Sequence, residues 1–255
     1  MSLRTNAYVE LHAWLAAAGR SSVPPPPGLE AAAEVYAKGL SNDDRDEMLG
    51  RTTAALGACT DDRCARAALE RTPFRRAWSG SFDTFVARWW TERANLARTG
   101  VEIAREAFSV ESEGLLLSVS RALGVEWPDH PIPVDVVVES PPAGHDALVT
   151  VALPVHGPCF VRDDGERTRH ARMLDCVLVR AFFPLREQSK RGAALDERAW
   201  QLLVIHAVAA TISSWEPKHV SPSWRSAYAV EPERLRWLKE HWPTDDLSPM
   251  MKREP

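Results

Sequence analysis

A short segment rich in β-branched residues interrupts a chain whose apolar residues otherwise follow helical spacing. The segment Pro131–Glu139 contains the run Val-Asp-Val-Val-Val and is bounded by prolines, which favours an extended strand. Turn residues occupy Ser140–Gly144, and Ala147–Leu153 and Pro158–Arg162 are predicted as two further strands. The sequence therefore predicts a predominantly helical α+β fold, with a small sheet of about three strands at roughly residues 132–162 packed against buried helices.

The segments on either side of the predicted sheet show the 3.6-residue period of amphipathic helices. Before the sheet, apolar spacing and capping residues predict helices at Tyr8–Gly19, Leu29–Leu40, Ser41–Leu56, a stretch opened by Thr60-Asp61-Asp62, Phe82 to about Phe108, and Ser112–Leu123 with Gly124 as a C-cap. After the sheet, Arg172–Phe183 and Trp200–Ser214 are almost wholly apolar, which predicts burial on several sides. Pro232 is placed to open a last helix.

The change of pattern near Trp127 divides the chain into predicted parts. We expect a helical N-terminal subdomain at residues 1–125 and an α+β subdomain at residues 126–243, together forming one compact domain. A loose tail is expected at residues 244–255. The chain shows no internal repeat and no long linker.

Composition and charge narrow the classes of function. The 255 residues include 31 Lys+Arg and 35 Asp+Glu, which gives a net charge of −4. This balance lacks the basic field of most nucleic-acid-binding proteins. The cluster Arg88-Trp89-Trp90 with Arg93 is interpreted as a helix with Trp inside and Arg outside. Because of this charge balance we expect no nucleic-acid partner. The sequence contains no membrane span of about 20 apolar residues and no secretory signal, so we also expect no membrane as partner.

The four cysteines contain no C-x-x-C pair. Cys59 and Cys64 are five positions apart, and Cys159 and Cys176 lie far from them. We therefore expect free thiols and a cytoplasmic location.

Common catalytic motifs are missing from the sequence: G-x-x-x-x-G-K-[ST], G-x-G-x-x-G, G-x-S-x-G and H-E-x-x-H do not occur. The remaining polar candidates are His156 with Cys159, which would need a turn to meet, and His206 on an apolar helix. His206 is interpreted first as a core histidine and second as a ligand or base. His145 is interpreted as a solvated turn residue.

The predicted elements follow one another as a Val-Asp-Val-Val strand, an Ala-Gly turn, a second strand and an apolar helix. This order resembles that of a group of uncharacterised bacterial zincin-like proteins of the gluzincin metallopeptidase type. The resemblance covers roughly residues 130 to 215. It includes two helices, Leu174–Phe183 and Ala199–Ala210, with Trp200 and Leu203 among the matching positions. The resemblance implies a zincin-like fold for the second subdomain.

The zinc-binding residues of that group are replaced in this chain. The two histidine positions hold Val179 and Phe183, the general-base position holds Arg180, and the third-ligand position holds Ala210. Val, Phe and Ala have no lone pair for a cation, and a guanidinium repels Zn²⁺. The resemblance therefore implies a pseudo-metallopeptidase with no catalytic residue, no bound metal and no cofactor. A displaced site around His206 and His219 is the alternative to a cleft filled by Phe182, Phe183 and Trp side chains.

Three functional hypotheses remain open at this point. The preferred one is a non-catalytic zincin-like protein with a binding or regulatory role and an unknown partner, for which a protein is one candidate. The second is a hydrolase with a non-standard site around His206 or the His156/Cys159 pair. The third is a protein–protein interaction module with a Trp-rich C-terminal surface made by Trp215, Trp224, Trp237 and Trp242.

Overall fold

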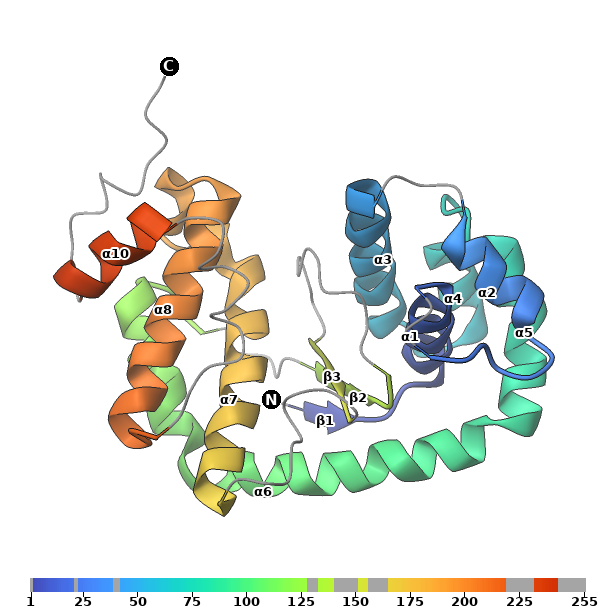
Figure 1. The fold of residues 1–255 in the computed structure, drawn as a ribbon, viewed down its shortest axis with the longest axis horizontal. Coiled ribbons are helices and arrows are strands. Elements are labelled where there is room, and N and C mark those ends of the chain that lie inside the picture. The colour runs from blue at the N-terminus through green and yellow to red at the C-terminus, as the bar shows by residue number, and fades with distance from the viewer. Residues whose placement is uncertain are drawn as a thin grey trace. The chain divides into compact units, whose positions relative to one another are not determined.

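The computed structural model describes residues 2–20, 23–38, 42–127, 133–139, 151–155, 165–218 and 232–242. The chain divides into two compact units (Figure 1). Unit 1 comprises Met1–Arg105 and Pro131–Phe160, and unit 2 comprises Glu106–His130 and Val161–Pro255. The long helix α6, Trp90–Leu123, runs from unit 1 into unit 2. The fold is mostly helical with one small sheet, as the sequence predicts.

Unit 1 combines five helices with the start of α6 and a parallel sheet. Its elements are β1 Ser2–Arg4, α1 Ala7–Gly19, α2 Glu30–Ala37, α3 Asn42–Gly57, α4 Asp62–Ala68, α5 Arg75–Arg88, β2 Pro133–Val137 and β3 Val151–Pro154. The described strands follow the order β1-β2-β3. Leu3 pairs with Val134, and Val136 pairs with Leu153.

The sheet confirms part of the prediction and changes the rest. The strand predicted at Pro131–Glu139 is β2, and the next predicted strand is shortened to β3. The strand β1 comes from the N-terminus, which the sequence analysis did not predict. The strand predicted at Pro158–Arg162 lies outside the described residues. Because the sheet belongs to unit 1, it groups with the N-terminal helices, whereas the sequence analysis placed it with residues 126–243.

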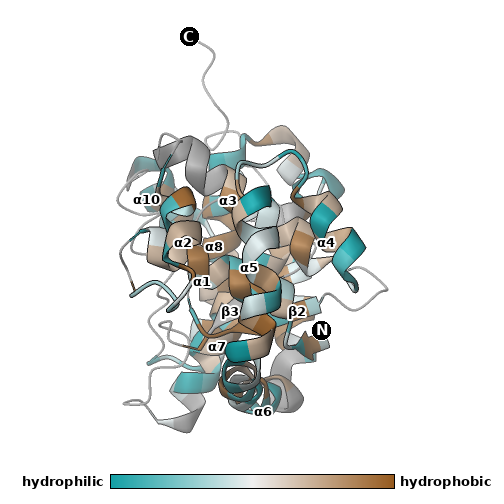
Figure 2. Ribbon diagram, turned by 90° about the vertical axis from the view of Figure 1, so that its right-hand side faces the viewer, coloured by the Kyte–Doolittle hydropathy of each residue, from teal (hydrophilic) through white to brown (hydrophobic). Residues whose placement is uncertain are grey.

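The core of unit 1 is built around α1. The side chain of Asn6 accepts hydrogen bonds from the backbone of Tyr8 and Val9, which caps the helix. The helix is buried over most of its length, and Leu11 and Leu15 are inaccessible to solvent. In Figure 2, α5 carries both hydrophobic and hydrophilic residues, as expected for a helix with one side on a core.

Helix α1 approaches α2 closely at Gly19. A Cβ atom on Gly19 would lie 2.9 Å from the carbonyl carbon of Tyr36, so only glycine fits there. The predicted end of the first helix at Gly19 is confirmed.

The helix boundary at Trp89 differs from the prediction. The sequence predicts one helix from Phe82 to about Phe108, whereas the structure has α5 and α6 with the boundary at Trp89. Neighbouring residues in one helix point about 100° apart. The break lets both Trp89 and Trp90 pack against the same core.

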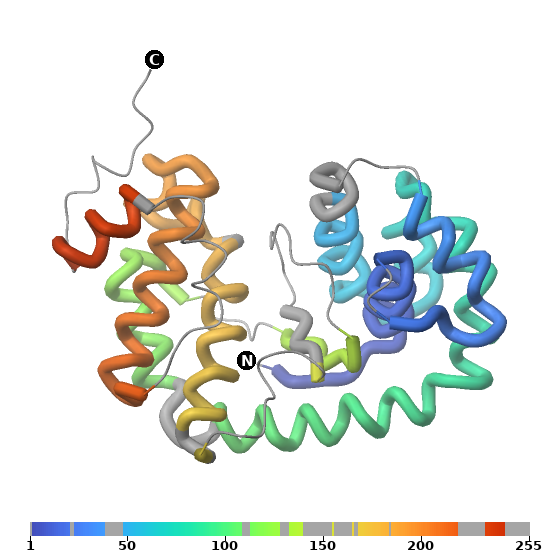
Figure 3. The backbone as a smooth tube through the Cα atoms, viewed as in Figure 1, coloured from blue at the N-terminus to red at the C-terminus, as the bar shows by residue number. Residues whose placement is uncertain are grey.

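The described part of unit 2 contains the end of α6 and three further helices. These are α7 Glu166–Phe182, α8 Glu197–Trp215 and α10 Pro232–His241, with short 3-10 turns η2 Phe183–Gln188 and η3 Gly192–Ala194. Within unit 2, α7 and α8 pack side by side and run in opposite directions (Figure 3). The predicted burial of both helices on several sides is confirmed, because nearly all residues of 170–179 and all of 202–209 are buried. Gly124 ends α6 with a φ of 63°, as predicted for a C-cap.

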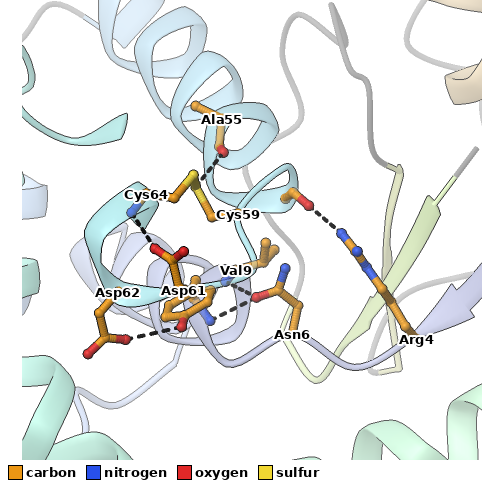
Figure 4. The surroundings of a disulfide bond; sticks show 10 residues. Arg4, Asn6, Val9, Ala55, Cys59, Asp61, Asp62 and Cys64 are labelled. Atoms are coloured by element: carbon orange, nitrogen blue, oxygen red, sulfur yellow. Dashed lines mark hydrogen bonds between the residues drawn. A yellow bond between two sulfur atoms is a disulfide. The ribbon is translucent and has the colours of Figure 1, made fainter. Parts of the chain in front are cut away.

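Two cysteines form a disulfide, so the prediction of free thiols is wrong. Cys59 and Cys64 are bonded, with their Cα atoms 5.4 Å apart (Figure 4). Their spacing fits because Cys59 follows the end of α3 and Cys64 lies in the first turn of α4, where Asp61 caps the helix by accepting a hydrogen bond from the Cys64 backbone. A search for C-x-x-C pairs does not detect a bridge that spans a helix–helix turn.

None of the described helices is long and apolar enough to cross a membrane.

Candidate functional site

The positions that match the zinc site of the resembled group lie on α7, η2 and α8 in unit 2. Val179 has only 3% of its surface exposed, and Phe182 beside it is fully buried. The half-buried Arg180 donates from Nη1 to the carbonyl oxygen of Cys176, one turn earlier, across 3.3 Å. These side chains form an apolar end of α7, with a guanidinium bonded to its own helix.

Trp200 joins the beginning of α8 to the end of α7. Its Nε1 donates to the carbonyl oxygen of Phe183 across 2.8 Å. Ala210 lies ten residues further along α8, which corresponds to about 15 Å of helix. The structure thus brings Val179, Arg180 and Phe183 together within about one turn, and places Ala210 in the second half of the neighbouring helix.

The described residues contain no group of three or more His, Cys, Asp or Glu side chains that could hold a metal ion. A zinc site needs at least three such donors within about 2.3 Å of one point. Among the described side chains, donors for zinc are therefore not gathered at the matched positions.

His206 lies inside unit 2 on α8. Only 6% of its surface is exposed, and its ring packs edge-to-face on Trp242 with 5.2 Å between the ring centroids. Burial, together with the charge of Lys239, lowers the pKa of His206 to about 4. The imidazole is therefore neutral at pH 7 and a weak base, as expected for a core histidine.

Only some of the other predicted candidate residues lie in the part of the chain that the structure describes. His156, Cys159, His145, His219 and Trp224 lie outside the described residues. The described members of the Trp-rich set, namely Trp215, Trp237 and Trp242, are each half-buried.

A buried charge network in unit 1 escaped the sequence analysis. Arg93 of α6 donates from Nε to Glu10 of α1 across 2.5 Å and from Nη2 to Glu139 across 3.2 Å. The second oxygen of Glu10 accepts a hydrogen bond from the Val138 backbone at 2.9 Å, and the Arg93 guanidinium lies 3.9 Å from the ring centre of Trp14. The network connects α1 and α6 with the residues that follow β2.

This network uses its polar groups internally. Burial raises the pKa of Glu10, although Arg93 and the Val138 backbone oppose the shift. The Arg93 guanidinium is shared between two carboxylates and an aromatic face. The arrangement therefore fits a structural role better than a ligand site. The sequence contained only the lone Glu10 within an apolar helix as a signal.

Two more polar contacts hold unit 1 together. The Arg4 guanidinium pairs with the buried Asp135 at 2.7 Å and also contacts the Gly57 carbonyl. The fully buried His12 lies 3.0 Å from the Tyr36 hydroxyl and 3.1 Å from the Leu49 carbonyl oxygen. Because a carbonyl only accepts, Nε2 of His12 carries the proton and Nδ1 accepts from Tyr36.

Comparisons of the chain with protein-family models, curated proteins and solved structures found no match.

Proposed function

We propose that the protein is a non-catalytic, zincin-like binding protein of bacterial type, in which the zinc site of a metallopeptidase ancestor has been lost. The observation that supports this proposal is the chemistry at the matched positions. Val179, Phe183 and Ala210 offer no donor to a metal, and Arg180 would place a fixed positive charge where a general base is needed.

The packing of unit 2 supports the same proposal. Val179 is buried, and the neighbouring Phe182 is inaccessible to solvent. Large apolar side chains at such positions favour a dry, close-packed interior.

A peptidase assay tests the proposal. The protein is dialysed against zinc and incubated with a mixed peptide library, and the products are identified by mass spectrometry. We expect the same products as in buffer alone. Cleavage that increases with added zinc and stops with a chelator would overturn the proposal.

The alternative of a hydrolase built on His206 has its own control in that assay. A pKa of about 4 leaves His206 a poor base at neutral pH. Zinc-independent cleavage that disappears in His206→Asn, with the circular dichroism spectrum unchanged, would establish this alternative.

A Trp-rich interaction surface is the second candidate function, and it is favoured by the partial exposure of its described members. Trp237 is half-buried on α10 and stacks on the exposed His241 with 5.0 Å between ring centroids. Aromatic side chains are enriched at the centres of protein interfaces. A partner that binds the wild type and is lost in Trp237→Ala, with the fold retained, would support this function.

The cytoplasmic location belongs to the proposal as well. The disulfide between Cys59 and Cys64 argues against it, since such bonds persist mainly in oxidising compartments. Alkylation of thiols in intact cells tests the location. In a cytoplasmic protein Cys59 and Cys64 are both labelled, and in an exported protein neither of them is.

A further inference from the structure

A groove of ligand size opens between four elements of unit 1. It has a volume of about 510 Å³ and lies between the first turn of α1, the first residue of α4, the second half of α5 and the first residue of α6. Its lining includes Tyr8, Asp62, Phe82, Asp83, Val86 and Trp90, which we call the aromatic–acidic groove. Typical ligand sites have volumes of about 300–1,000 Å³. The groove is separate from the positions on α7 and α8, so the inference does not depend on the proposed loss of a zinc site.

One wall of the groove is a fixed stack of rings. Tyr8 stacks on Phe82 with 5.1 Å between ring centroids and an interplanar angle of 25°. Phe82 stacks in turn on Trp78, at 4.7 Å and 17°, and Trp78 is fully buried. Because the core supports this stack, the aromatic wall is preorganised.

The other feature of the groove is its pair of carboxylates. The Tyr8 hydroxyl donates to Asp62 across 3.1 Å, and Asp62 lies inside the loop closed by the Cys59–Cys64 disulfide. Both Asp62 and Asp83 are exposed. Within the part of the chain that the structure describes, neither carboxylate forms an ion pair. Two negative charges therefore lie beside an aromatic wall with no cation from the described residues paired to them.

Aromatic faces and carboxylates attract the same kind of ligand group. A ring face binds ammonium and guanidinium groups through its quadrupole, while the methylene stems of Lys and Arg pack on apolar surface. Val86, with 41% of its surface exposed, offers such a surface next to the carboxylates. We propose that the aromatic–acidic groove binds a lysine or arginine side chain presented by a segment of a partner protein.

The openness of the groove favours a polypeptide over a free small molecule. Asp62, Asp83 and Val86 are exposed, and of the six named residues only Phe82 is buried. Small-molecule sites enclose most of their ligand's surface. A side chain on a longer segment gains further contacts outside the groove, which compensates for an incomplete enclosure.

Titration with short peptides tests the proposal. The probes are acetyl-Gly-Gly-Arg-Gly-Gly-amide, its lysine counterpart, and a peptide with citrulline in place of arginine. Citrulline has nearly the shape of arginine and no charge. The readout is the indole N–H resonance of Trp90 in nitrogen-15 correlation spectra, assigned with Trp90→Phe. We expect the two cationic peptides to shift this resonance in a saturable manner, and the citrulline peptide to have at least a severalfold weaker effect.

Matched variants localise the binding. Asp62→Asn and Asp83→Asn should each weaken binding by roughly two- to fivefold, the range for exposed ion pairs. Glu70→Gln is the control, because Glu70 is an exposed carboxylate of unit 1 outside the groove. Its affinity should equal that of the wild type. Asp83→Asn removes no hydrogen bond between described residues, so it should fold even if Asp62→Asn does not.

Three results would overturn the proposal. The first is a Trp90 resonance that no cationic peptide shifts. The second is equal binding of the arginine and citrulline peptides, or an equal effect of Asp83→Asn and Glu70→Gln. The third is saturable binding of tetramethylammonium in the groove without binding of either cationic peptide, which would assign the groove to a small organic cation instead.

Discussion

Arg93 and Glu10 form an ion pair inside unit 1, where 9% of the arginine side chain and 1% of the glutamate side chain remain exposed. Removing two charges from water is costly, and such a pair is favourable only when its other donors and acceptors are satisfied. Glu139, the Val138 backbone and the ring of Trp14 meet that requirement. The pair therefore ties α1 to α6 beside the end of β2.

Replacement of Arg93 by Met should lower the free energy of unfolding by about 3–5 kcal/mol, because two carboxylates then lose their cation in a buried place. Glu10→Gln should lower the free energy of unfolding by a smaller amount, since Arg93 keeps its bond to Glu139. Urea unfolding followed by circular dichroism measures both. Arg105→Met is the control, because the Arg105–Glu102 pair is exposed and should contribute about 0–1 kcal/mol. Equal losses in Arg93→Met and Arg105→Met would contradict the structural role of the buried pair.

His12 should make unit 1 sensitive to acid. Burial lowers the pKa of His12 to about 4, although the Leu49 carbonyl opposes the shift, and an unfolded histidine titrates at about 6.5. The folded value is depressed, so the stabilisation is complete above about pH 6.5 and is lost as the pH falls towards about 4. Between pH 7 and pH 5 the wild type should lose about 2 kcal/mol more than His12→Gln.

His206 and the other buried groups titrate in both proteins, so their contribution to the pH dependence of stability cancels in the difference between the wild type and His12→Gln. Parallel stability curves for the wild type and His12→Gln between pH 7 and pH 5 would refute the assignment of a buried neutral imidazole.

Gly192 should not tolerate a side chain. A Cβ atom there would lie 2.6 Å from the Arg186 carbonyl oxygen and 2.9 Å from the ring of Trp200. Gly192→Ala should therefore destabilise the protein by about 1–3 kcal/mol through overpacking. Gly114→Ala is the matched change, because nothing lies within 4 Å of its Cβ position on α6; it should raise stability by about 0.5–1 kcal/mol. Thermal unfolding distinguishes the two, and a neutral Gly192→Ala would show that η3 does not pack on Trp200.

The disulfide should contribute measurably despite its short loop. For the five-residue separation of Cys59 and Cys64, chain-entropy arguments give about 2 kcal/mol. The double variant Cys59→Ala/Cys64→Ala should lose this amount in urea unfolding. Because Cys176 is disulfide-bonded as well, reductant should destabilise both proteins, and the difference in stability between the wild type and the Cys59–Cys64 double variant should shrink by about this amount when reductant is added. A wild type that is insensitive to reductant would contradict the bond.

Local sequence patterns predicted the elements whose signals are local. The β-branched run at Pro133–Val137 is a strand, and Pro232 is the first residue of α10. The helix predicted to open at Thr60-Asp61-Asp62 is α4, and among these three polar residues it is Asp61 that accepts the capping bond. Which of several adjacent polar residues caps a helix depends on the local backbone geometry, and the sequence alone does not specify it.

Long-range pairings could not be predicted. The strand Ser2–Arg4 has no β-branched residue and exists because it pairs with residues 133–135, about 130 positions away. The candidate groove depends on the same kind of proximity. Tyr8, Asp62 and Asp83 meet only because the first turns of α1 and α4 pack beside α5, and a single sequence carries no sign of that contact.

The zinc content of the purified wild type distinguishes a lost zinc site from a retained one. The protein is dialysed first against zinc and then against zinc-free buffer, and metal per chain is measured by inductively coupled plasma mass spectrometry. We expect zinc at the background level of an unrelated control protein, because Val179, Phe183 and Ala210 supply no ligand. Close to one zinc per chain retained after dialysis would contradict this expectation.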